Sequence, residues 1–282
     1  MNHHRESFSL LAMCRVFGVS RGGFYSWLRA GHSRRKRFEL RVAIREIFYE
    51  SDESYGNPRV YRELRARGIK ACKSSVEKIM RTLGFRGKKR RRFKVTTDSK
   101  HSFAIAPNLV NRSFDRGAKN VVWLSDITYL RLKEGFGYLA AVMDAHTRKI
   151  VGFKVSDHMR DELVCDALAS SYFCERPPKN LLIHSDRGSQ YASETYRKQL
   201  TSYGMIQSMS RKANCWDNAP MESFFDSLKT ELISKKVFET IDEAKSSIFE
   251  WIEIFYNKKR LHSALGYVSP ACFEQRIMAK AA

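Results

Sequence analysis

Three acidic residues occupy positions where a carboxylate could do chemistry. Asp126 lies inside an apolar segment with the composition of a strand, where an uncompensated charge is costly to bury. Asp186 directly follows a short apolar run, the kind of strand end where open α/β sheets place their sites. Glu222 falls in the first turn of a helix that begins near Pro220, and 35 residues separate it from Asp186.

Carboxylates that converge without a thiol or imidazole favour a hard, oxygen-seeking cation, Mg²⁺ or Mn²⁺. Two such ions about 3.5–4 Å apart can activate an attacking oxygen and stabilise a leaving oxygen at phosphorus. We therefore predict that Asp126, Asp186 and Glu222 are catalytic residues that bind two Mg²⁺ ions, with Mn²⁺ as the alternative. The chain has 30 acidic residues, so a chance triplet is the competing interpretation, and the expected placement on strands and a helix argues against it.

The pattern around these acids predicts the elements that position them. Val, Ile, Trp, Tyr and Thr dominate three strand-like segments with short turns between them, which indicates an antiparallel meander. The expected strands are 120–130, 137–145, 149–156, 180–185 and 205–208, and the expected helices are 161–174, 194–203 and 219–233. This order predicts an α/β, ribonuclease-H-like fold: a mixed five-strand sheet with helices on both faces.

The first third of the chain predicts an all-α, helix-turn-helix DNA-binding region. Ser9 and Ser20 are expected to cap helices over 9–17 and 20–29, with Gly18 in the turn between them. A second helical group should begin near Phe38, after the basic run 34–37. Its next helix should run from Asn57 to about residue 67.

The last helix of this group is the one expected to read DNA. Ser74 and Glu77 predict a capping box for a helix that ends near residue 83. It carries the expected DNA contacts Lys73, Lys78 and Arg81, which suits entry into the major groove. A small helical bundle that binds protein is the alternative.

Charge supports the nucleic-acid interpretation. Lys and Arg number 51 against 30 Asp and Glu, and residues 1–100 alone hold 26 basic and 9 acidic side chains. A positive field concentrated in one third of the chain attracts a polyanion and gains from counterion release. The alternative, a basic surface that only aids solubility, would be spread more evenly along the chain.

Residues 86–94 are the densest basic stretch, with seven basic side chains among nine. Such a run repels itself and is expected to be a linker that lies along phosphates, with DNA contacts from Lys88, Lys89, Arg90, Arg91 and Arg92. The predicted division of the chain is 1–37, a partial helix-turn-helix; 38–85, a helical DNA-binding domain; 86–117, a basic linker; 118–235, the catalytic core; and 236–282, a C-terminal helical extension.

The extension should begin with a capping box formed by Thr240 and Glu243. Near its end, Arg260 is a candidate DNA contact, although basic residues at a helix C-terminus also compensate the helix dipole. Four further residues receive structural interpretations: Asn218 as a helix cap, His184 as a packed histidine, and Trp123 and Trp216 as core residues. Gln190 and Tyr191 are assigned with equal weight to a turn-and-packing role or to a functional one, in which they orient Asp186 or contact DNA.

Other classes of protein are disfavoured. No run approaches the roughly 18–20 apolar residues of a membrane span, and the first residues lack a secretory pattern. The six cysteines form no zinc-like spacing and are interpreted as reduced thiols. A cytoplasmic protein is the expectation.

Six segments together resemble one family. They are G-V-S-R-G-G-F-Y-S-W (18–27), Y-G-N-P-R-V-Y (55–61), W-L-S-D-I-T-Y (123–129), H-S-D-R-G-S-Q-Y (184–191), W-D-N-A-P-M-E-S-F-F (216–225) and Y-N-K-K-R-L-H-S-A-L-G-Y-V-S-P (256–270). In this order they resemble the OrfB-type transposases of the insertion sequence three family, which share a DDE, retroviral-integrase-like core. The resemblance covers about residues 10 to 275.

The resemblance implies roles for matching positions. It assigns metal binding to Asp126, Asp186 and Glu222, and contact with an end phosphate to Lys229, seven residues after the glutamate. It implies nicking at the ends of the element, followed by attack of the freed 3′-hydroxyl on another phosphodiester.

The implied partners are double-stranded DNA (transposon ends and target), an upstream-frame OrfA-type protein or a frameshift fusion with it, and further copies of the chain on DNA. The implied location is the bacterial cytoplasm, with nucleoid association. A ribonuclease-H-like nuclease without strand transfer and a non-catalytic DNA-binding regulator are the two alternative functions.

Overall fold

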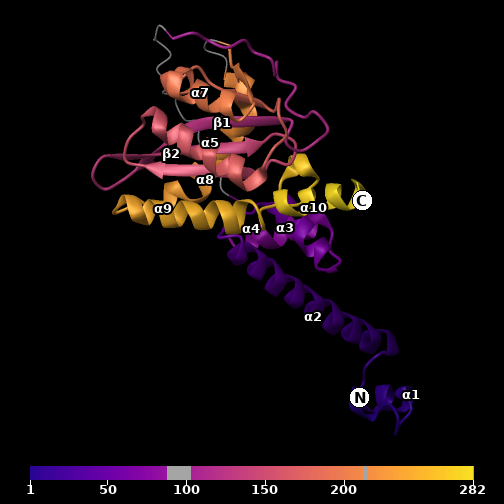
Figure 1. Ribbon diagram of the computed structural model, residues 1–282. Coiled ribbons are helices and arrows are strands. Elements are labelled where there is room, and N and C mark those ends of the chain that lie inside the picture. The colour runs from indigo at the N-terminus through magenta and orange to yellow at the C-terminus, as the bar shows by residue number, and fades with distance from the viewer. Residues whose placement is uncertain (88–102, 212–214, 282) are drawn as a thin grey trace. The chain divides into compact units, whose positions relative to one another are not determined.

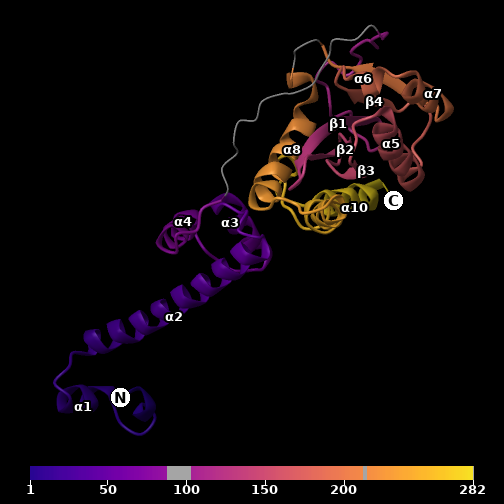
Figure 2. The same cartoon turned by 90° about the vertical axis from the view of Figure 1, so that its left-hand side faces the viewer.

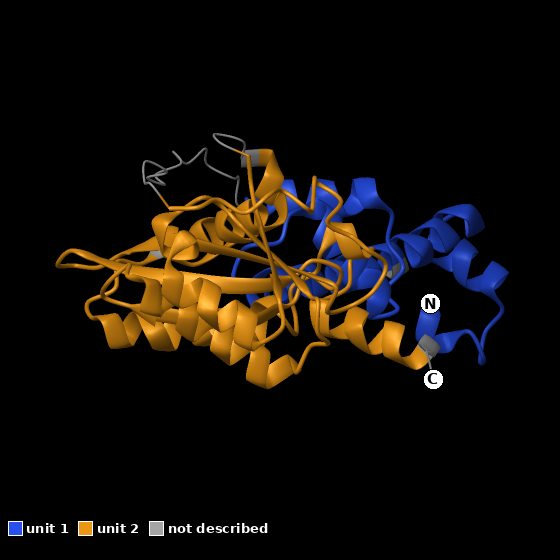
Figure 3. Cartoon of the chain, turned by 45° about the horizontal axis from the view of Figure 1, so that its top comes forward, with its two compact units in different colours: residues 1–87 blue, residues 88–282 orange. Residues whose placement is uncertain are grey.

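The computed structural model describes residues 1–87, 103–211 and 215–281. The chain divides into two compact units, residues 1–87 and 88–282 (Figure 3). The first unit is helical and the second contains the sheet. None of the described helices combines the length and the apolar character that crossing a membrane requires.

In the first unit, two serines begin helices as predicted. The Ser9 hydroxyl accepts a hydrogen bond from the Ala12 N–H at the start of α1 (Leu10–Val16), and Ser20 accepts one from Gly23 at the start of α2 (Arg21–Glu50). The prediction that this second helix ends near residue 29 is wrong, because α2 continues for 30 residues and includes the basic run. Exposed cations on a helix are solvated, and Arg35 pairs with Glu39 one turn along.

The rest of the unit packs on the end of α2. α3 (Asn57–Ala66) and α4 (Lys73–Thr82) bury one apolar face each, and the shared core contains Ile44, Ile47, Phe48, Val60, Leu64, Val76 and Met80. The predicted capping box at Ser74 is wrong, because the cap position lies two residues earlier, at Cys72, and α4 begins at Lys73. The Ser74 and Ser75 hydroxyls lie instead at 3.3 and 3.0 Å from Cys72 Sγ.

The second unit is built on a mixed sheet of five strands (Figure 1). The strands are β1 (Val122–Arg131), β2 (Phe136–Asp144), β3 (Ile150–Ser156), β4 (Leu182–Ser185) and β5 (Ile206–Met209). Their order is β3-β2-β1-β4-β5, with β1–β3 forming the predicted antiparallel meander and β4 and β5 added in parallel. The long first strand is therefore at the centre.

Helices cover both faces of this sheet (Figure 2). α5 (Asp161–Glu175), α6 (Ser189–Ala192) and α7 (Glu194–Ser202) share a core with Trp123, whereas α8 (Ala219–Glu231) and α9 (Ile241–Phe249) share a core with Leu124. Alternate residues of β1 thus point to opposite helical layers. The ribonuclease-H-like fold class predicted from the sequence is confirmed.

The C-terminal residues complete this same core. A π-helical turn (Glu250–Tyr256) continues α9, and a further helix, α10 (Pro270–Ala281), follows that the sequence did not predict. The Asn257 amide bonds both the N–H and the carbonyl of Ile150 at 3.0 Å, as a neighbouring strand would. The segment expected to be an extension from residue 236 therefore packs within the second unit.

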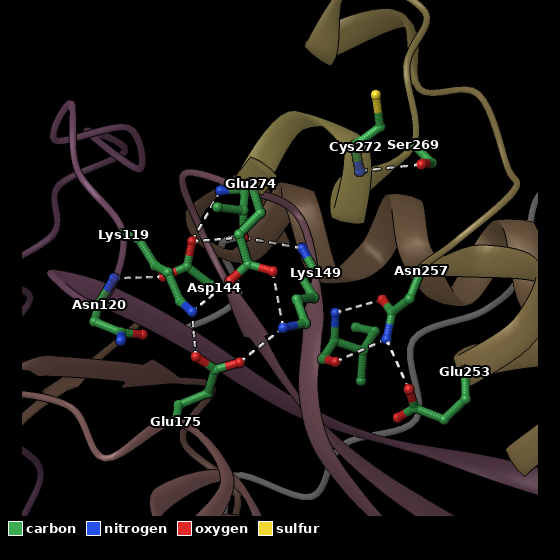
Figure 4. A network of polar contacts seen from close by, with 12 residues as sticks. Lys119, Asn120, Asp144, Lys149, Glu175, Glu253, Asn257, Ser269, Cys272 and Glu274 are labelled. Carbon is green, nitrogen blue, oxygen red and sulfur yellow. Dashed lines mark hydrogen bonds and ion pairs between the residues drawn. The ribbon is translucent and has the colours of Figure 1, made fainter. Parts of the chain in front are cut away.

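A ring of four charges fixes α10 to the sheet (Figure 4). Lys149 Nζ lies 2.9 Å from both Glu175 Oε1 and Glu274 Oε2, and Lys119 contacts the same two carboxylates. The ring joins the end of α5, the β2–β3 turn and the last helix of the chain.

Candidate active site

The two aspartates lie side by side because of the strand register. The last aligned pair of β1 and β4 is Leu124 with His184. Asp126 lies two residues after Leu124, and Asp186 lies two residues after His184. Neighbouring strands are about 4.8 Å apart. Asp126 and Asp186 are therefore adjacent where β4 ends, and both side chains are half-buried.

Backbone N–H groups orient both carboxylates. Ile127 donates to Asp126 Oδ1 at 2.8 Å, and Gly188 donates to Asp186 Oδ1 at 2.9 Å. The second bond closes the turn that leads from β4 into α6. Each carboxylate is thus oriented by a backbone N–H one or two residues further along its own segment.

Glu222 reaches the same region from the first turn of α8. Asn218 occupies the cap position of this helix, as predicted, but its side chain makes no capping bond. Its Nδ2 donates instead to the carbonyl of Ser125 at 3.2 Å, the residue before Asp126. This bond ties the start of α8 to the central strand beside the aspartates.

Ser125, the residue before Asp126, also links β1 to the helix that follows Asp186. Its hydroxyl lies 3.0 Å from the Tyr191 hydroxyl, and both side chains are buried. Tyr191 belongs to α6, directly after the Asp186 turn. Ser125 therefore contacts the helix that follows the Asp186 turn and, through its carbonyl, the residue that precedes the helix of Glu222. These contacts support the packing interpretation of Tyr191. Gln190 likewise donates to the Met159 carbonyl at 2.9 Å.

The electrostatics show an excess of negative charge. Burial raises the pKa of Asp126 well above its ordinary value, and the charges of Asp186 and then Glu222 raise it further. Burial lowers the pKa of Lys229, while the charge of Asp126 acts in the opposite direction. Lys229 therefore lies close enough to offset part of the negative charge of the acids.

These residues fit a hard cation by the chemistry of their donors. The only groups offered are carboxylate oxygens, and their mutual repulsion is a cost that a bound cation would relieve. In the described part of the chain, no three acidic, histidine or cysteine side chains are already gathered as a metal-binding group. The strongest interaction of Asp126 with another acid is with Asp186.

The predicted DNA contacts are divided by the structure. Lys73, Lys78 and Arg81 are exposed on α4, where Arg81 also pairs with Glu77. Lys88, Lys89, Arg90, Arg91 and Arg92 lie outside the described residues. The prediction that Arg260 contacts DNA is wrong, because its side chain is only 5% exposed and is bound by the Glu231 carboxylate. A buried, paired guanidinium cannot reach a DNA backbone from this position.

Two aromatic predictions and the histidine have clear outcomes. Trp123 is fully buried as predicted, but Trp216 is 67% exposed, so its assignment to the core is wrong. His184 is a packed histidine: its Nδ1 and Nε2 lie 2.8 and 3.1 Å from the hydroxyls of Ser208 and Ser210.

Sequence reasoning missed Ser125 and Asp217. Asp217 is fully buried and is bound by Asn108, Arg112 and Arg211. Its position next to Asn218, within one of the six segments, was the only available signal. Arg211 lies six residues before Asp217, but Arg112 and Asn108 are more than 100 residues away, so the sequence could not show the complete pairing.

Comparisons with known proteins agree across the chain. Two models described as integrase core domain match residues 117–215 and 203–270, and one described as an HTH-like domain matches residues 35–93. An uncharacterized 31 kDa protein of insertion element IS600 from Shigella sonnei is 44% identical, over 94% of this chain and 98% of its own length.

The transposase InsF for insertion sequence IS3A from Escherichia coli (strain K12) is 38% identical, over 98% of this chain and 97% of its own. Among solved structures, a simian T-cell lymphotropic virus intasome in complex with PP2A regulatory subunit B56 gamma has a TM-score of 0.46 and 14% identity, over 75% of this chain and 69% of that chain.

Proposed function

This chain belongs to the insertion sequence three family of DNA transposases, and we propose that Asp126, Asp186 and Glu222 are its catalytic acids. The enzyme is a DDE-type polynucleotidyl transferase with an integrase core. The observation that carries the assignment of the site is the parallel register that sets the two aspartates side by side, with Glu222 arriving on α8.

We propose that the three carboxylates bind Mg²⁺, with two ions in the working site and Mn²⁺ as a substitute. Such ions activate the attacking oxygen and stabilise the leaving oxygen of an in-line displacement. The chain itself fixes where this occurs. The backbone bonds from Ile127 and Gly188 orient the aspartates, and Asn218 holds the glutamate helix against β1.

The reaction consists of two transfers at phosphorus. In the first, a water oxygen bonds to the phosphorus at the end of the element, the bond from phosphorus to the 3′ oxygen breaks, and that oxygen leaves as a hydroxyl. In the second, the same 3′ oxygen bonds to a phosphorus of another strand and displaces its 3′ oxygen. The first step hydrolyses a phosphodiester, and the second exchanges one phosphodiester for another. Neither step needs an external energy source. We propose that Lys229, which interacts with the charge of Asp126, contacts a phosphate of the end.

DNA binding is shared by the two units. The match to an HTH-like domain over residues 35–93 implies DNA binding. We propose that this region binds double-stranded DNA, that Lys73, Lys78 and Arg81 contact it from α4, and that Lys88, Lys89, Arg90, Arg91 and Arg92 also contact it. These contacts would bring the transposon end and the target to the catalytic unit. We also propose the division of the chain into residues 1–37, 38–85, 86–117, 118–235 and 236–282, in which the first three parts bind DNA and the fourth is the catalytic core.

Further partners follow from the family rather than from the geometry. We propose that the chain works with an upstream-frame OrfA-type protein, as a separate subunit or as a frameshift fusion, and that several copies assemble on DNA. We also propose that it acts at the nucleoid in the bacterial cytoplasm, where these substrates lie. Co-purification of the tagged upstream protein with this chain, on and off DNA, tests the first point.

The central experiment uses labelled duplexes that carry candidate element ends. With Mg²⁺ or Mn²⁺ we expect a nick at the end, and with a pre-nicked 3′-hydroxyl end we expect joined products; EDTA should abolish both. The Glu222→Gln variant should lose both products and keep DNA binding, because the substitution removes a charge at the site and leaves the helical unit intact.

The outcomes separate the alternatives. Nicking without joined products would indicate a nuclease, and binding without either product would indicate a regulator. If Glu222→Gln nicks like the wild-type protein, the assignment of the acids is wrong.

A further inference from the structure

A buried carboxylate next to the catalytic acids holds two arginines from distant segments. Asp217 is fully buried, and it accepts hydrogen bonds from Arg112 Nε at 3.0 Å and from Arg211 N, Nε and Nη2 at 3.0, 2.9 and 2.8 Å. Asn108 Nδ2 adds a further bond at 3.0 Å. The hydrogen bonds from Arg211 hold the pKa of Asp217 far below its usual range, so the carboxylate stays charged.

The two arginines extend from this buried anchor into solvent. The Arg112 side chain is 49% exposed and the Arg211 side chain is 48% exposed, while the carboxylate beneath them is inaccessible. Each guanidinium therefore combines a fixed end on the carboxylate with a surface that solvent can reach.

This cluster lies at the catalytic edge of the sheet. Ser210, directly before Arg211, donates its N–H to the carbonyl of Ser185 at 2.9 Å, and Ser185 directly precedes Asp186. Asp217 directly precedes Asn218, whose amide bonds Ser125 next to Asp126. Arg211 and Asp217 therefore each lie next to a residue, Ser210 or Asn218, that is hydrogen-bonded to the neighbour of a catalytic aspartate.

A guanidinium has five N–H donors arranged on more than one edge, so it can bind a carboxylate on one edge and a phosphate on another. Holding the side chain in place beforehand reduces the entropy lost on binding. The half-exposed guanidinium groups, the rigid anchor and the position beside the acids all suit a ligand that must pass the site. That ligand is the sugar-phosphate backbone.

We propose that Arg112 and Arg211, held by Asp217, form a binding site for a backbone phosphate of the DNA that enters the active site. The proposal rests on the proposed function, because it assumes that DNA is the substrate at Asp126 and Asp186. It adds a contact from the catalytic unit to those expected from the helical unit and from Lys229.

The test is DNA binding by the full-length protein over a range of salt concentrations. The variants are Arg112→Gln and Arg211→Gln, each of which leaves Asp217 with the other arginine. Each lost phosphate contact should lower the slope of log affinity against log salt by about 1 and weaken binding several-fold at low salt. Measurement in EDTA keeps the readout independent of cleavage.

The matched control is Arg116→Gln. Arg116 lies on the same segment as Arg112 and is exposed, but its guanidinium donates to the carbonyls of Ser113 and Leu109 rather than to Asp217. The same loss of charge should therefore leave the salt slope unchanged. Thermal unfolding of all three variants shows whether any effect comes from loss of the fold.

Wild-type slopes for both Arg112→Gln and Arg211→Gln would overturn the proposal. So would lowered melting temperatures with an unchanged slope, since that result describes an internal brace. A failure of the proposed function would look different: the wild-type protein would bind DNA with the same dependence on these arginines and yet give no metal-dependent products.

Discussion

The Arg260 guanidinium binds the Glu231 carboxylate through Nε at 3.2 and 2.9 Å and through Nη2 at 2.7 Å, with both side chains buried. Nη2 also donates to the Ser227 hydroxyl at 2.9 Å. Glu231 is the last residue of α8, the helix that carries Glu222 and Lys229. The C-terminal segment therefore holds the far end of the catalytic helix.

Replacing Arg260 with Gln should destabilise the catalytic unit strongly. The substitution leaves the Glu231 carboxylate buried without its cation, which typically costs about 3–5 kcal/mol. Urea unfolding measures the loss, and Lys258→Ala, an exposed cation two residues away, is the control that should change stability little. Normal stability with weakened DNA binding would instead restore the DNA-contact role of Arg260.

The Ser125–Tyr191 pair should behave as a single positioning unit. Ser125→Ala and Tyr191→Phe each leave a buried hydroxyl without its partner, at a cost of about 1–3 kcal/mol. The double variant leaves neither hydroxyl behind, so its loss should be smaller than the sum of the single losses. Urea unfolding measures the coupling, and nicking rates at saturating DNA show whether the pair also positions the acids. Additive losses in both measurements would show that the two hydroxyls act independently.

The ring of Lys119, Lys149, Glu175 and Glu274 should make stability depend on pH. Burial alone would raise the pKa of Glu175, but the hydrogen bonds from Lys119 and Lys149 lower it overall. A carboxyl with a lowered folded-state pKa contributes stability above its unfolded pKa of about 4.3, and that contribution is lost as pH falls through the folded value.

The lysines give the opposite sign, because burial lowers the pKa of each but the two glutamates raise it overall, so their contribution is lost only in strong alkali. Thermal unfolding between pH 7 and pH 3 should show a smaller acid loss in Glu175→Gln than in the wild-type protein. Glu239→Gln, which removes an exposed pair with Lys133, is the control that should keep the wild-type slope.

Much of the fold could be predicted from residue patterns because its elements are bounded by strong local signals. The strand periodicity of β1–β3 and the helix start at Pro220 depend on neighbours within a few residues. The continuity of α2 could not be predicted in this way. A cluster of like charges suggests a break, and only the packing of the C-terminal half of α2 shows that the helix continues.

The same distinction between local and long-range signals applies to the site. Asp126, Asp186 and Glu222 were found because each stands at the end or in the middle of a locally recognisable element. Their supports were not found, because Asp217 and Arg112 are 105 residues apart and Ser125 and Tyr191 are 66 apart. Burial and pairing over such separations depend on the tertiary fold, and a single sequence contains no signal for them.

The alignment of Leu124 with His184 also constrains how a gene for this enzyme can change. One inserted codon between Leu124 and Asp126 would turn the aspartate toward α5 on the other face of the sheet, since strand side chains alternate. Leu130 and the other residues of β1 after the insertion would change face with it, while the separate helical unit would keep its own core. Such an element would lose its mobility while its product still bound element ends through that unit, in competition with intact copies.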